Sequence, residues 1–166
     1  MKFIDCVKIF IICSFLVGFG CGSGGGGGSV PAQHAVLKLS TNPFAPYTTL
    51  GGVRVRISLP VGSTVATDGT GAVQNGVITP IGVLAASGQV GFVSYSAPTV
   101  NLPGAIKFFM VTPIGDMSFK DGEFAQVLCN FSGTAPVKSS FLLTLAATSA
   151  DGHSAVANET FTLSIQ

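Results

Sequence analysis

The sequence contains no tryptophan, and only 9% of its 166 residues are charged at neutral pH. About a quarter of the residues in an average soluble domain are charged. Few charges together with abundant glycine, serine, threonine and valine favour an extracellular β protein over a cytosolic helical one. Without tryptophan, the chain lacks the residue that fills an immunoglobulin core. It also lacks the ring that most often stacks on sugars.

The chain also lacks an excess of either charge sign, with a formal net charge of +1. Once Lys2, Lys8 and Asp5 of the first twenty residues are set aside, basic and acidic residues are equal in number. This balance gives no electrostatic argument for nucleic acid or an anionic surface as a partner.

Sequence motifs of catalysis are missing too. No G-x-S-x-G, C-x-x-C or H-E-x-x-H pattern occurs. Asp151, His153 and Ser154 are close in sequence, but the members of a catalytic triad converge from separate elements. We therefore interpret these three residues as a hairpin tip, and we expect neither enzymatic activity nor a cofactor. A polysaccharide-active enzyme is the least favoured function class.

The N-terminus combines Lys2 and Lys8 with an apolar stretch, residues 9–19, that ends at Gly20 and Cys21. A membrane-spanning helix needs about 20 apolar residues, more than this stretch provides. The pattern is typical of a secretory signal peptide. Gly20-Cys21 resembles the lipobox of bacterial lipoproteins, in which the cysteine is acylated and becomes the new N-terminus. The alternatives are a secreted protein cut near Gly20 and an uncleaved anchor.

The sequence thus predicts a helical lipoprotein signal peptide at residues 1–20 and, at residues 21–33, the lipidated Cys21 followed by a linker. Gly22 to Ser29 are all glycine or serine, so they form a flexible tether with a reach of about 15 Å. The resemblance implies an extracytoplasmic location on a bacterial membrane, either the outer membrane or the cell surface. Membrane contact is expected through the lipid alone.

Residues 34–166 show the alternation of β-strands and almost no helical periodicity. Glycine, proline, asparagine and aspartate separate the apolar runs. We expect an all-β domain of two packed antiparallel sheets. The predicted strands are 34–40, 52–59, 72–80, 88–96, 104–112, 123–131, 140–148 and 159–165.

The clearest strand is 52–59, where apolar residues alternate with Arg54, Arg56 and Ser58. One face of this strand should be buried and the other exposed to water. Cys129 has no partner if Cys21 is acylated, and we predict that it is a small buried side chain. The phenylalanines expected in the core are Phe92, Phe108, Phe124, Phe131, Phe141 and Phe161.

Three stretches give the domain a family resemblance: "GGVRVRISLPVGSTVATD" (51–68), "GAIKFFMVT" (104–112) and "FKDGEFAQVLCNF" (119–131). They are similar to the strands and turns of bacterial cohesin-like domains. The resemblance implies a jelly-roll-like β-sandwich that is shared with some carbohydrate-binding modules. Cohesins bind dockerin proteins through one sheet face, although no contact residue can be carried over. We expect a non-catalytic module that binds an extracellular protein; the alternative is a carbohydrate-binding module.

Two further groups of residues are candidate sites. Tyr47 and Tyr95 could face a ligand, although packing within a loop or strand explains them as well. Asp116, Asp121 and Glu123 cluster in "GDMSFKDGEF" and could supply oxygens to a calcium ion, with Asp68 as a further ligand. Asp-Gly pairs are equally typical of turns, so no metal site is predicted.

Overall fold

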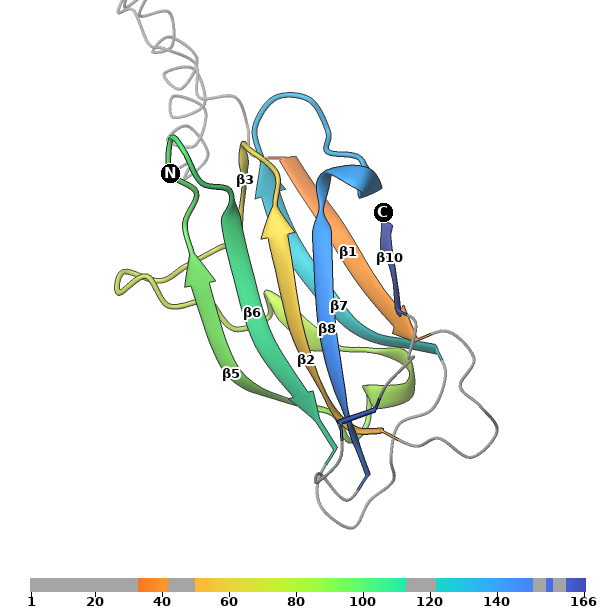
Figure 1. Ribbon diagram of the computed structural model, residues 1–166. Coiled ribbons are helices and arrows are strands. Elements are labelled where there is room, and N and C mark those ends of the chain that lie inside the picture. The colour runs from red at the N-terminus through yellow and green to blue at the C-terminus, as the bar shows by residue number, and fades with distance from the viewer. Residues whose placement is uncertain (1–32, 42–49, 113–121, 151–154, 157–160) are drawn as a thin grey trace, which may run out of the picture.

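A computed structural model describes residues 33–41, 50–112, 122–150, 155–156 and 161–166. These residues form two antiparallel sheets that face each other, as Figure 1 shows. The expected all-β class is confirmed. The predicted signal peptide, lipidated Cys21 and linker lie outside the described residues.

The first sheet, called the β1–β7 sheet here, has the strand order β10-β1-β7-β3, and β4 also pairs with β7. Long strands β1 and β7 form its centre, and their registers make β7 the partner of β1, β3 and β4. The strand bounds are β1 Gln33–Thr41, β3 Ser63–Thr64, β4 Ile78–Pro80, β7 Gly122–Phe131 and β10 Phe161–Ile165.

The second sheet, called the β2–β6 sheet, has the strand order β5-β6-β2-β8-β9. All its pairings are antiparallel. Two short 3₁₀ helices, η1 Gly82–Leu84 and η2 Lys138–Ser140, lie in the connections. The strand bounds are β2 Leu50–Leu59, β5 Gln89–Ser96, β6 Gly104–Val111, β8 Leu142–Ser149 and β9 Ala155–Val156.

A single hydrophobic core lies between the sheets. Phe108 and Ile57 of one sheet and Phe124 and Leu37 of the other are almost completely inaccessible to solvent. Cys129 of β7 is also buried and free, and this burial raises the pKa of its thiol to about 12. The expected role of Cys129 as a small buried side chain is confirmed.

Strand β2 shows the predicted alternation from Val53 to Leu59. Val53, Val55, Ile57 and Leu59 are buried, while Arg54 and Arg56 are exposed. The period of two places successive side chains on opposite sides of the sheet. Burial of the apolar set supplies the driving force for docking this strand against the β1–β7 sheet.

The strand predicted at 72–80 is mostly wrong, because only its last three residues, β4, form a strand, while Val73 makes an isolated bridge with Thr67. Gly76 has a φ of +88°, a conformation that glycine adopts without steric cost. The Val77 amide donates a hydrogen bond to the Gln74 carbonyl at 3.3 Å. Asn75-Gly76 therefore forms a turn, which delays the strand until Ile78.

The phenylalanine predictions are confirmed for four residues and wrong for one. Phe108, Phe124, Phe131 and Phe141 are buried, whereas Phe92 is 80% exposed. The side chain of Phe161 lies outside the part that the structure describes.

No helix within the described segments is long and apolar enough to cross a membrane.

Candidate functional site

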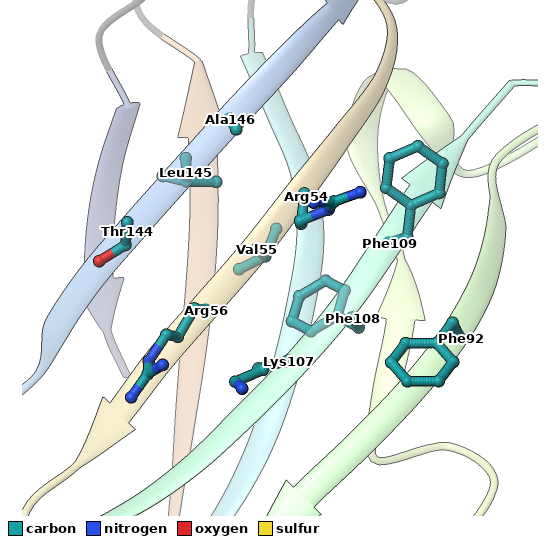
Figure 2. A pocket seen from close by; sticks show the side chains of 10 residues that line it. All are labelled: Arg54, Val55, Arg56, Phe92, Lys107, Phe108, Phe109, Thr144, Leu145 and Ala146. Carbon is teal, nitrogen blue, oxygen red and sulfur yellow. The ribbon is translucent and has the colours of Figure 1, made fainter.

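A groove of about 600 Å³ runs over the outer face of the β2–β6 sheet, away from the core. Figure 2 shows that its side chains come from four neighbouring strands, β5, β6, β2 and β8. The residues that project outward into it include Arg54, Arg56, Phe92, Lys107, Phe109 and Thr144.

The strand registers arrange these side chains in two rows across the sheet. Arg54 lies between Phe109 of β6 and Ala146 of β8. Arg56 lies between Lys107 and Thr144, two residues further along β2. Directly opposed side chains on one face are about 5 Å apart at Cβ. The groove therefore places cationic groups next to an aromatic ring.

Positive charge on this face is not balanced by acidic residues. The groove lining contains Arg54, Arg56 and Lys107 but no carboxylate. Among the described residues, Lys38 forms an ion pair with Glu123 on the β1–β7 sheet, with 3.6 Å between nitrogen and oxygen. Directly opposed like charges, such as Arg56 and Lys107, destabilise a sheet. An anionic partner would remove that cost.

Phe92 reaches the groove through a distortion of β5. The register between β5 and β6 shifts between Gly91 and Ser94, which marks a β-bulge. Phe92 has a φ of +26°, the one positive φ outside glycine in the described residues. A bulky residue at positive φ is an outlier that stores strain. The bulge turns the ring outward, which explains why the expected core position is wrong.

Phe109 is accommodated by glycine on the neighbouring strand. A Cβ atom built on Gly52 of β2 would lie 3.0 Å from Cζ of Phe109, closer than ordinary van der Waals contact. The absent side chain leaves room for the ring beside Arg54. Phe109 is half-buried on this face, while its neighbour Phe108 points into the core. These two neighbouring residues therefore lie on opposite faces of β6.

Tyr95 lies on the opposite side of β5 from the groove. It pairs with the buried Ile106 and packs against the core. Burial raises the pKa of its phenol. The Val65 backbone lowers this pKa by a smaller amount. By geometric criteria the buried hydroxyl forms no hydrogen bond with the described residues. The other candidate tyrosine, Tyr47, lies outside the described residues.

The calcium candidates are only partly described, because Asp116 and Asp121 lie outside the described residues. Glu123 pairs with Lys38. The Asp68 carboxylate accepts bonds from the Thr70 amide and hydroxyl at 2.8 and 2.7 Å. The Thr70 hydroxyl bond is the main cause that lowers the pKa of Asp68. Within the described segments, no three metal-ligating side chains come together.

Sequence reasoning identified two of the exposed residues of this groove but not the groove itself. The alternation in residues 52–59 predicts that Arg54 and Arg56 lie on a solvated face, whereas the sequence alone indicates no role for Lys107. The missing information was that β6 is the neighbour of β2, which brings Lys107 opposite Arg56. The outward positions of strands 52–59 and 104–112 contain three cations and a ring, but only the pairing of these strands places them on one face.

The groove has the chemistry of a binding site. Guanidinium groups offer paired donors to carboxylate, phosphate or sulfate groups, and the phenylalanine rings offer apolar contact. Its lining contains no histidine, thiol or acid. Comparisons of the chain with protein-family models, curated proteins and solved structures found no match. Its geometry therefore carries the functional interpretation.

Proposed function

We propose that this chain is a non-catalytic binding module, anchored by lipid outside the cytoplasm of a bacterium, that recognises a protein partner through the β2–β6 sheet. The observation that carries the proposal is the groove with Arg54, Arg56 and Lys107 and no facing acid. The proposal extends to a jelly-roll-like sandwich related to cohesins, which is supported by the two facing antiparallel sheets.

The partner that fits the groove is an acidic segment of an extracellular protein. Carboxylates of the segment would bind the arginines, and apolar side chains would cover Phe92 and Phe109. A sheet face with a mixed polar and apolar surface is suited to shape-complementary protein recognition. Charge complementarity would contribute mostly to specificity and to the rate of association.

A binding experiment with matched variants tests this function. The Cys21→Ser chain, freed from the membrane, is used as bait against secreted and cell-surface proteins. A captured protein is then purified, and its affinity is measured directly. We expect Arg54→Ala with Arg56→Ala to abolish capture, and Lys138→Ala, which removes an exposed cation outside the groove, to leave it unchanged. Equal capture by all variants would contradict the proposal.

A carbohydrate ligand is the second candidate, favoured by the exposed ring of Phe92 beside the cations. An acidic polysaccharide would place its carboxylates on the arginines and a sugar face on the ring. An array of neutral and acidic polysaccharides distinguishes the two candidates. Selective retention on one polysaccharide, lost in Phe92→Ala, would favour this second function. Hydrolysis of any glycan would contradict both.

The anchor has its own test. Labelling with palmitate should mark the wild-type chain, and Cys21→Ser should lose both the label and membrane retention. Persistent label in the variant would contradict the lipoprotein assignment.

A further inference from the structure

Exposed aliphatic side chains gather on three loops of the sandwich. Val61 lies in the turn between β2 and β3, and Val100 and Leu102 lie in the hairpin between β5 and β6. Val137 lies in the loop between β7 and β8. Val61 and Val100 are almost fully exposed, and Leu102 and Val137 are exposed by 66% and 61%. Single exposed apolar residues are common on protein surfaces, whereas larger apolar patches mark interaction sites, so the relative positions of these residues decide their meaning.

The strand registers place these three loops at the same end of the sandwich. Leu59, the last residue of β2, pairs with Gly104, the first residue of β6. Ser63 of β3 pairs with Phe131, the last residue of β7. The Ser132 amide also donates a hydrogen bond to the Gly62 carbonyl at 3.1 Å. Figure 1 shows the three loops together at the top of the view.

The first described strand begins at this end as well. Gln33, the first residue of β1, pairs with Phe131, and β1 runs away from the three loops (Figure 1). Cys21 precedes Gln33 by a glycine- and serine-rich stretch. Such a chain spans about 20 Å on average. A lipid on Cys21 would therefore hold this end, rather than the opposite one, close to the membrane.

Charge at this end favours a lipid surface. The acids among the described residues are Asp68 and Glu123, and neither lies in the three loops. Lys138 follows Val137 and is exposed. A lysine beside aliphatic residues can contact phosphate groups while the aliphatic side chains enter the apolar boundary.

We infer that the tips of these three loops insert into the lipid headgroup region and orient the anchored domain. This inference rests on the lipid anchor in the proposed function, but it concerns a surface separate from the groove. The tether raises the local concentration of the tips at the bilayer, and removing exposed aliphatic side chains from water is favourable. The groove, on a side face of the sandwich, then stays open to a partner.

The absence of tryptophan makes a direct test possible, because one introduced tryptophan is the only one in the chain. Val100→Trp and Val137→Trp each place it on a different loop, at an exposed position where we expect little effect on folding. Phe92→Trp is the matched control, since it places an exposed ring on the groove face. The lipidated full chains are reconstituted in bilayers of phosphatidylethanolamine with some phosphatidylglycerol.

We expect brominated lipids to quench most of the emission at positions 100 and 137, with a shift to shorter wavelength, and to leave position 92 unchanged. Absent quenching at positions 100 and 137 in a chain that carries palmitate would overturn the inference while leaving the anchor intact. Absent palmitate would instead contradict the proposed anchor. Equal quenching at all three positions would also overturn the inference, because the domain would then have no fixed orientation.

Discussion

The outer faces of the two sheets differ in whether their charged side chains have partners of opposite charge. On the β1–β7 sheet, Lys38 is paired with Glu123 at 3.6 Å, and Nδ1 of His34 lies 2.8 Å from the Asn130 side-chain oxygen. On the β2–β6 sheet, Arg54, Arg56 and Lys107 project into a groove whose lining contains no acid. The first face pairs these polar groups with one another, whereas the second leaves its cations available to a ligand.

The inner faces, in contrast, are equivalent. Both sheets contribute fully buried aliphatic and aromatic side chains to one cluster. Both sheets therefore contribute to stability through the same core. They differ in their outer faces. If the β2–β6 sheet binds a partner, substitutions at its inward positions should lower stability, and substitutions at its outward positions should lower affinity. The two effects should separate even within one strand.

The largest effect is expected for the two fully buried phenylalanines, one from each sheet. Phe124→Ala and Phe108→Ala should each lower the free energy of unfolding by about 3–5 kcal/mol, since each leaves a cavity in the shared core. Urea unfolding followed by circular dichroism measures this, with Phe109→Ala on the outer face as the milder control. Two separate unfolding transitions would show that the sheets do not depend on a common core.

Within β2, the same reasoning separates two adjacent residues. Ile57→Ala should lower the free energy of unfolding by about 2–5 kcal/mol. Arg56→Ala should change it by less than about 0.5 kcal/mol, because its side chain is exposed. Thermal and urea unfolding of both variants provide the measurement. Similar losses at the two positions would mean that the outward face of β2 contributes to stability.

The sequence alone predicted the parts of the fold that depend on local alternation. The faces of β2 and the burial of Phe108, Phe124 and Cys129 follow from a period of two and from side-chain type. The same method failed at Phe92, because a bulge in β5 changes the phase of the alternation. A bulge leaves no sure mark in a single sequence.

The groove could not be predicted from the sequence for a second reason. It forms where β5, β6, β2 and β8 become neighbours, and strand order depends on long-range pairing. Overall charge balance also concealed it, because the acids that balance Arg54, Arg56 and Lys107 in the count are absent from the groove lining. Net charge is a property of the whole chain, whereas recognition depends on the charge of the face that binds.

Binding should respond to the two arginines of the groove and not to the lysine of the other sheet. A charge-assisted hydrogen bond contributes about 1.5–3 kcal/mol, so each of Arg54→Ala and Arg56→Ala should weaken partner affinity roughly tenfold or more. Lys38→Ala breaks a partly exposed pair and should leave affinity unchanged, with a stability loss below about 1 kcal/mol. Calorimetric titration at two salt concentrations measures the affinities, and urea unfolding measures the stability loss. A loss of affinity with Lys38→Ala would place the partner on the β1–β7 sheet.

The smallest effect concerns the strained backbone at Phe92, with its φ of +26°. Glycine tolerates positive φ, whereas alanine retains the Cβ atom that makes it costly. Phe92→Gly should therefore have a free energy of unfolding about 1 kcal/mol higher than Phe92→Ala. Both variants remove the exposed ring, so both should weaken partner binding equally. Urea unfolding and titration of this pair separate backbone strain from ring contact. If the two variants were equally stable, the backbone of β5 would hold no strain at this position.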